Sequence, residues 1–326
     1  MLFDGSECYI RLANSQSTSI DNILMKIQNG NQTIREICTI NQGIVSGADY
    51  VSEKHLSKYP ISSQKRDGIF VLDELHPSDA SVLNTILHNS NDKTLLKVFF
   101  KNSDIGKYVT NEKSTKHILF LGKDIKNELM LKKLYPIIAE HIYAFKQILV
   151  DKRASLNEKT EQWFTLNRGT SHPEVFSKCK IVCPQRSKTN TFGYNECEWY
   201  AASDVFFLTN PKEGYDLKYI LGLLNSKLYF MWLYSKGKRK GETLELTATP
   251  LSEIPIKKVA DREMSSVVLL VDSIISAKKQ GKNTSALENQ IDFLVYHLYG
   301  LTYDEVLIVD PDTPISREEY EAYKEE

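Results

Sequence analysis

Apolar residues follow two different patterns along the chain. In the first two thirds they form short runs rich in β-branched and aromatic residues, which predict strands at 68–72, 117–122, 180–184 and 199–209. Polar stretches rich in Gly, Asn, Ser and Pro separate these runs, notably 151–178 and 184–198, and predict loops. Loops of this length on a strand scaffold often carry the function of a protein.

Helical periodicity begins at about 216–234, where Leu217, Leu221, Leu224 and Leu228 recur at intervals of three or four residues. This spacing predicts one core helix with a broad apolar face. Polar residues within it, such as Asn225, are interpreted as packing or capping positions.

The last third of the chain also has helical spacing. Two apolar stripes, over 267–275 and 287–298, predict antiparallel helices joined at about 280–284. Ser285 and Glu288 are spaced as a capping box for the second helix. Thr302 and Glu305 repeat that spacing and predict a third, short helix.

These patterns divide the chain into four parts. Residues 1–33 form a polar lead-in or linker with one amphipathic stretch at 20–27, and residues 34–258 form a strand-rich domain with its own core helix. Residues 259–309 form a small C-terminal helical bundle, and residues 310–326 a loosely held acidic tail. The predicted fold class is α+β.

Composition is that of a soluble globular protein: 41% of the 326 residues are hydrophobic and 25% are charged. No run approaches the ~18 consecutive apolar residues that a membrane helix needs. The N-terminus lacks the basic start and apolar core of a signal peptide. We therefore expect a cytoplasmic protein without a membrane partner.

The formal net charge of −1 conceals an uneven distribution. Residues 302–326 carry 9 acidic and 2 basic side chains, so residues 1–301 have a net charge of +6. A mildly basic body fits a polyanion-binding surface, but an ordinary protein with a solvated acidic terminus would show the same distribution.

Five cysteines are too few, and odd in number, for a disulfide framework. Cys179, Cys183 and Cys197, together with His172, offer four zinc-ligand side chains, but no CxxC spacing is present. We expect buried thiols instead.

Sequence motifs of catalysis are absent. The chain contains no GxxxxGK[ST] phosphate loop, GxGxxG turn, GxSxG elbow or HExxH helix, and no NPPY-type tetrapeptide. We expect that this chain is not catalytic by itself. One alternative stays open, a divergent nuclease in which carboxylates such as Asp204, Glu196 and Glu198 converge on Mg²⁺.

Cations, amides and hydroxyls concentrate in several of the predicted loops. In the stretch 184–190, Arg pairs well with guanine edges and Gln or Asn with adenine edges, which suits base contacts by Gln185, Arg186 and Asn190. Lysines and hydroxyls suit phosphate contacts. The predicted phosphate-binding residues are Ser187, Lys188, Lys236, Lys238, Arg239, Lys240, Lys152, Arg153 and Arg168. A smaller group lies at 64–66. One basic cluster alone is more often a solvated surface, so both interpretations stay open.

Longer strings of the sequence are recognisable together. The chain resembles the TaqI-like C-terminal specificity domain, the DNA target-recognition part of type II and related restriction–modification methyltransferases. The matching strings are GIVSGADY (43–50), FKNSDIGKY (100–108), KIVCPQRSKTNTFGYN (180–195), WYAASDVFFLT (199–209), YILGLLNSKLYFMWLY (219–234), GKRKGETLELTATPLSEIPI (237–256) and IDFLVYHLYGLTYDEV (291–306).

This resemblance implies a target-recognition domain that binds double-stranded DNA while a methyltransferase or endonuclease modifies it, with adenine N6 as the modified position. It implies that the catalytic part lies outside this chain, in a separate subunit or in the rest of a longer enzyme. S-adenosylmethionine and Mg²⁺ would then belong to that part, and this chain would need no cofactor. A third possibility is a protein-binding scaffold in phage defence, with the helical unit as its working surface.

Overall fold

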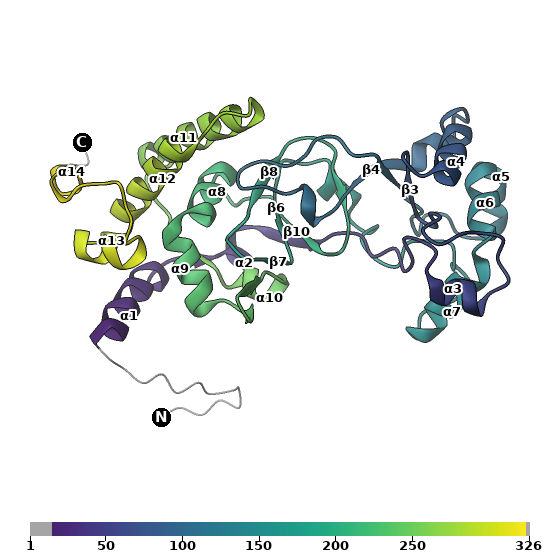
Figure 1. Ribbon diagram of the computed structural model, residues 1–326, viewed down its shortest axis with the longest axis horizontal. Coiled ribbons are helices and arrows are strands. Elements are labelled where there is room, and N and C mark those ends of the chain that lie inside the picture. Colours follow the sequence, from purple (N-terminus) through teal and green to yellow (C-terminus); the bar gives the residue numbers. More distant parts are fainter. Residues whose placement is uncertain (1–14, 324–326) are drawn as a thin grey trace.

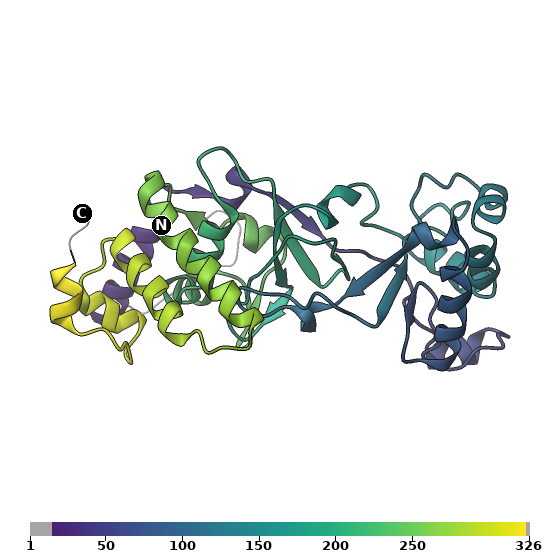
Figure 2. The same cartoon turned by 90° about the horizontal axis from the view of Figure 1, so that it is seen from above.

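The computed structural model describes residues 15–323, which form an elongated molecule (Figures 1 and 2). The helices are α1 (Ser15–Gln28), α2 (Ile34–Ile37), α3 (Glu53–Lys58), α4 (Pro77–Leu87), α5 (Glu128–Leu134), α6 (Pro136–Tyr143), α7 (Lys146–Ser155), α8 (Leu217–Asn225), α9 (Lys227–Lys236), α10 (Ala248–Ser252), α11 (Asp261–Lys279), α12 (Ser285–Leu298), α13 (Tyr303–Val309) and α14 (Arg317–Ala322). The strands are β1 (Gln32–Thr33), β2 (Thr39–Gln42), β3 (Val71–Asp73), β4 (Leu96–Phe100), β5 (Lys116–Leu119), β6 (Lys180–Pro184), β7 (Arg186–Ser187), β8 (Gly193–Asn195), β9 (Tyr200–Ala201), β10 (Val205–Thr209), β11 (Arg239–Lys240), β12 (Thr243–Glu245) and β13 (Pro255–Ile256). The fold is α+β, as predicted.

An antiparallel central sheet of order β2-β10-β6-β8 occupies the middle of the molecule (Figure 1). Its two inner strands are buried on both faces. Ile181, Cys183 and Phe206 point into a first core, whereas Val182 and Phe207 point into a second core on the opposite face. Alternate residues of a strand face opposite ways, so these continuous apolar runs serve two cores at once.

The second core extends from the central sheet to the end of the molecule where α3–α7 lie, drawn at the right of Figure 1. There a second sheet has the order β3-β5-β4-β9, with β9 parallel to β4. Sequence analysis predicted a single strand over 199–209, but residues 202–204 separate β9 from β10, and the two strands belong to different sheets. It also missed the helices α3–α7 of this end.

The first core joins the central sheet to α8, α11 and α12 at the other end. Helices α8 and α11 approach closely at Gly222, where a Cβ atom would lie 2.7 Å from Val267 Cγ1. The C-terminal helices form as predicted, and they complete the core of the sheet instead of forming a bundle with a core of its own.

The acidic C-terminal segment is held against the body up to residue 323. Tyr320 of α14 is only 3% exposed and its hydroxyl donates to the carbonyl of Leu301. Lys26 of α1 pairs with Glu305 of α13 at 2.6 Å. The prediction of a loosely held tail from residue 310 is therefore wrong for the described residues, because aromatic side chains anchor it.

The predicted helix over 216–234 is two helices. Asp216 caps the first through the N–H groups of Lys218 and Tyr219. Ser226 has extended backbone angles (φ −69°, ψ 159°) and caps α9 through the N–H of Tyr229. The capping box expected at Ser285 and Glu288 also differs, because Thr284 occupies the N-cap and its hydroxyl lies 2.6 Å from Glu288 Oε1. The box at Thr302 and Glu305 is confirmed.

Candidate nucleic-acid interface

A third, small sheet brings together two basic segments that lie far apart in the sequence. Its order is β11-β12-β7, all antiparallel. Strand β7 continues from β6 through Gln185. Helix α9 ends at Lys236, and the β11–β12 hairpin follows two residues later with the rest of the 236–241 segment. Two of the basic clusters expected from sequence therefore lie in or next to one small sheet, which we call the basic sheet (residues 185–188 and 236–245).

Glu245 connects the two segments. It is the register partner of Arg186, and its Oε1 accepts from the Arg186 guanidinium at 3.3 Å. Its Oε2 lies 3.1 Å from Lys238 Nζ. Hydrogen bonding to Lys238 and Arg186 lowers the pKa of the Glu245 carboxyl, so it carries a full negative charge at neutral pH. Glu245 thus fixes a cation from each segment.

Other cations of the basic sheet have no carboxylate partner among residues 15–323. Lys188, Lys236 and Lys240 are exposed and form no ion pair within this range. The Arg239 guanidinium lies 4.0 Å from the ring centroid of Tyr234 and makes a cation–π contact with it. The surface therefore has an excess of positive charge.

The backbone of Gln185 is hydrogen-bonded through both its N–H and its carbonyl where the basic sheet begins. Its N–H donates to Asp204 O at 2.7 Å, and its carbonyl accepts from Leu246 N at 2.8 Å. The side chain is half-buried, and no hydrogen bond from its amide is found within the described chain. Gln185 and Arg186 therefore sit next to each other on fixed backbone with polar groups available to a ligand.

Asn190 has a structural role. It is 1% exposed, and its Nδ2 donates to the carbonyls of Leu224 and Ser226, both at 2.8 Å. Asn225 completes this connection by bonding both the N–H and the carbonyl of Phe192. The amide of Asn190 thus attaches the loop after β7 to the break between α8 and α9, which removes it from the predicted base-contacting set.

The phosphate contacts predicted from 152–168 are corrected in part. Lys152 and Arg153 lie on α7 and not on a loop. Arg153 is 5% exposed and donates to Thr165 O and to Glu158, so its guanidinium supports the second core. Lys152 is exposed, but α7 lies at the opposite end of the molecule from α9 (Figure 1). Arg168 is exposed and borders a hollow described below.

Glu245 escaped the sequence analysis, although a signal was present. In the segment Leu244–Glu245–Leu246 the two leucines are buried and the glutamate is partly exposed. This period-2 alternation predicts a strand whose charged residue faces the same surface as its neighbours' basic residues. The pairing of β12 with β7 could not be predicted from that pattern.

The prediction of buried thiols holds for Cys183 and fails for Cys179 and Cys197. Cys38 and Cys183 are buried thiols, and burial raises the pKa of Cys38 to about 12. Cys179 and Cys197 are exposed. Within the described range, no group of three or more His, Cys, Asp or Glu side chains is placed to hold a metal ion.

The carboxylates of the nuclease alternative have separate partners. Glu198 pairs with Lys97, and Glu196 with Lys218. Burial raises the pKa of Asp204, whose nearest charges are Lys101 and Asp49. The structure therefore gives no support to a shared Mg²⁺ site at these residues.

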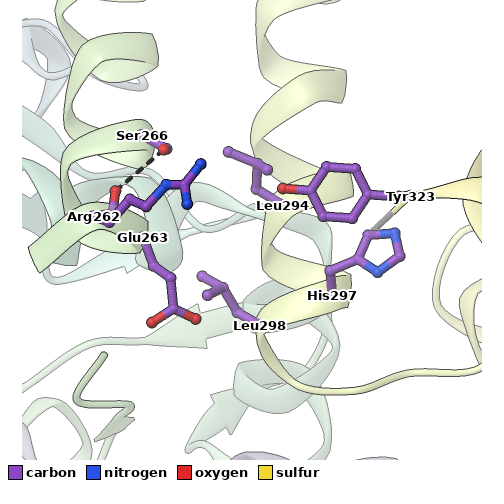
Figure 3. Close-up of a pocket in the computed structure, with 7 residues that line it drawn as sticks. All are labelled: Arg262, Glu263, Ser266, Leu294, His297, Leu298 and Tyr323. Carbon is purple, nitrogen blue, oxygen red and sulfur yellow. Dashed lines mark hydrogen bonds between the residues drawn. The ribbon is translucent and has the colours of Figure 1, made fainter. Parts of the chain in front are cut away.

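A small pocket of about 120 Å³ lies between α11 and α12 (Figure 3). Arg262 and Glu263 line it from α11, His297 from α12, and Tyr323 from the C-terminal segment. None of the residues predicted to contact DNA lines it. No helix of the described chain is long and apolar enough to cross a membrane.

The candidate interface is thus a small sheet with Arg, Lys, Gln and Ser side chains, held on a scaffold with two cores. Residues 97–256, just under half of the chain, match the model of the TaqI-like C-terminal specificity domain. This part of the chain is therefore similar to the specificity domains of restriction–modification systems.

Two type II methyltransferases are similar to most of this chain. The type II methyltransferase M.MjaIV of Methanocaldococcus jannaschii is 26% identical over 80% of this chain and 79% of its own length. The type II methyltransferase M.HindII of Haemophilus influenzae is 26% identical over 84% of this chain, which spans only 46% of that relative.

A solved structure shares the fold. The type IIL restriction–modification enzyme MmeI, solved in complex with DNA, matches 90% of this chain with a TM-score of 0.58 and 13% identity. The chain spans 37% of that enzyme.

Proposed function

We propose that this protein recognises a specific sequence in double-stranded DNA through the basic sheet, as the specificity part of a DNA methyltransferase or restriction enzyme. The observation that carries the proposal is the pairing of β7 with β12, which places Arg186 beside the 236–241 hairpin. A two-stranded β-ribbon fits the major groove of a duplex.

The side chains of the basic sheet divide into two roles. Arg186 and Gln185 contact base edges, since both side chains present planar hydrogen-bonding groups. Lys188, Lys236, Lys238, Arg239 and Lys240, with the hydroxyl of Ser187, contact phosphates. Phosphate contacts supply affinity and set the register of the protein on the duplex, while base contacts supply specificity.

The partner of this chain is a catalytic methyltransferase or endonuclease, in a separate subunit or in the same polypeptide. That part modifies adenine at N6 after the base leaves the helix, and it binds S-adenosylmethionine and, for cleavage, Mg²⁺. This chain binds the DNA and needs neither cofactor for doing so. This chain spans 46% of M.HindII and 37% of MmeI, so in each of those proteins the matching part is one portion of a longer polypeptide.

Selection from a randomised duplex pool tests the proposal. The purified chain is titrated with the pool by fluorescence anisotropy at several salt concentrations, and the retained DNA is sequenced. Salt-sensitive binding with an enriched short site is the expected result. Salt-sensitive binding without enrichment would place sequence recognition with the catalytic partner. No binding at low salt would overturn the proposal in favour of a protein-binding scaffold.

A further inference from the structure

A polar hollow lies beside the end of β2, separate from the basic sheet. Its volume is about 280 Å³, and it is lined by the end of β2, by Lys123, and by the segment from Asn167 to Phe176. Its floor includes the buried side chains of Val175 and Phe176. It is therefore a formed cavity with an apolar floor and polar walls.

Three basic residues line this hollow, and no carboxylate of the described part of the chain does. Lys123 and Arg168 are both exposed, and neither forms an ion pair with any residue from 15 to 323. His172 is the third basic group and pairs with Glu174 at 3.4 Å. Two uncompensated positive charges at one hollow favour an anion.

Two amide atoms of residues that line the hollow have no partner within residues 15–323. Asn167 is only 7% exposed, and its Nδ2 has no hydrogen-bond acceptor. On the other wall, the buried Oδ1 of Asn41 has no donor. Most buried polar atoms in folded proteins are paired, so these two lining residues keep hydrogen-bonding capacity that the fold does not use.

The frame of the hollow is fixed by close backbone contacts. A Cβ atom at Gly43 would lie 2.2 Å from Ala202 O, so only glycine allows this approach. Gly169 has a φ of +93° and lies against Ile44. These close contacts fix the position of Gly43 and Gly169, which both line the hollow, in the absence of a ligand.

We propose that this hollow binds a phosphate ester, with Lys123 and Arg168 as its charged ligands and the hydroxyls of Thr170 and Ser171 as further donors. The phosphate comes from a DNA strand or from a free nucleotide. The DNA source rests on the proposed function. Both the hollow and the basic sheet contact residues 203–204. Gln42, which lines the hollow, donates to Ser203 O, and the next carbonyl, Asp204 O, accepts from Gln185 of the basic sheet.

A charge-removing double variant, Lys123→Ala with Arg168→Ala, tests the site. Its control is Lys159→Ala with Lys282→Ala, which removes the same charge at two exposed positions outside the hollow. Both side chains of the test variant are exposed, so we expect both proteins to fold, which circular dichroism and urea unfolding would check.

Binding of each variant to a random-sequence duplex is measured as a function of salt, and dAMP and pyrophosphate are titrated in a thermal-shift assay. A DNA phosphate in the hollow would lower the salt slope by about one unit per lost contact in the test variant alone. A free nucleotide would instead raise the melting temperature of the original chain and of the control, but not of the test variant.

Either result supports the phosphate site and identifies its source. If the test variant and the control behave alike in both assays, the proposal is overturned. The nucleotide arm and the random duplex need no cognate site, so this failure is distinguishable from a failure of sequence recognition.

Discussion

Arg186 and Glu245 are register partners on β7 and β12, and their side chains meet across that pair with a distance of 3.3 Å between the guanidinium and Oε1. The contact uses one guanidinium nitrogen. The remaining donors of the planar group stay available. The cation that we propose contacts a base is therefore held in place by a residue 59 positions away in the sequence, on a strand of the β11–β12 hairpin.

Replacing Arg186 with alanine should relax specificity. A bidentate contact to a base edge contributes ~1–3 kcal/mol of discrimination, so the preference of Arg186→Ala for the selected site over a random duplex should fall by that amount. Anisotropy titrations on both duplexes measure the difference, with Arg317→Ala on α14 as the matched control. Equal losses of affinity on the two duplexes would show that Arg186 contacts phosphate.

Glu245→Gln should make binding stronger and less specific. The variant keeps the size of the side chain but removes the negative charge that holds Arg186 and Lys238. Affinity for random DNA should increase, since one repulsive charge is lost, and the ratio of specific to random affinity should decrease.

Glu245→Asp separates charge from geometry, because it keeps the charge on a shorter side chain. In this variant, the affinity for random DNA should return to the low value of the original chain. The ratio of specific to random affinity should stay below its original value. An unchanged ratio in both variants would mean that Glu245 does not position Arg186.

Removing Lys238 and Arg239 together should flatten the salt dependence of binding. Each phosphate contact contributes about 0.9 to the slope of log affinity against log salt, so loss of two contacts lowers it by roughly two units. The specificity ratio should stay close to its original value. Titration at four or more salt concentrations determines the slope, and an unaltered slope would rule out these two residues as phosphate ligands.

Asn190→Ala should destabilise the fold. The change leaves the carbonyls of Leu224 and Ser226 without their buried donor, and such losses cost about 1–3 kcal/mol in the free energy of unfolding. Thr189→Ala, at the exposed neighbouring position, should change it by less than ~0.5 kcal/mol. Urea unfolding measures both. A comparable effect in the two variants would contradict the structural role of Asn190.

Stability should fall as pH rises towards neutrality, in part because of Asp292. Burial raises the pKa of this carboxyl to about 7, against a value of ~3.9 in an unfolded chain. The folded state thus favours the protonated carboxyl of Asp292. The free energy of unfolding that this preference contributes is fully present below pH ~4 and is lost as pH rises through about 7.

Asp292→Asn removes the titration and keeps an acceptor for the N–H of Lys227. The loss of unfolding free energy between pH 5 and pH 8 should therefore be smaller in this variant than in the original chain. Asp312→Asn, at an exposed position, serves as the control. An identical pH dependence in all three proteins would show that Asp292 does not govern it.

Local sequence patterns predicted the elements with the strongest signals. The run 180–184 became β6 at the predicted boundaries, and the stripes over 267–275 and 287–298 lie in α11 and α12. Helices α3–α7 were missed because each is short, with 6 to 11 residues, and shows too few turns of periodicity. Residues 202–204 interrupt a continuous apolar run, and only the tertiary structure shows that β9 pairs with β4.

The candidate site was predictable in residue type and not in arrangement. Gln185, Arg186 and Lys188 have the exposure that their chemistry suggested, whereas Asn190 and Arg153 have the same kinds of polar group and are buried. Their burial depends on the break at Ser226 and on Thr165, which lie far away in the sequence or on another element. The adjacency of 184–190 and 236–240 depends on the non-local pairing of β7 with β12, for which the sequence contains no local signal.

Strand β6 is buried on both faces, which limits the positions at which the neighbouring chain can be substituted. A substitution at Ile181, Val182 or Cys183 disturbs one of two cores, so this strand tolerates little change. One residue beyond its end, the chain enters β7 and becomes exposed. Under the proposed function, a change of target would require exchanging residues 185–189 and 236–245 together between relatives, because the strand pairing and Glu245 make the two segments dependent on each other.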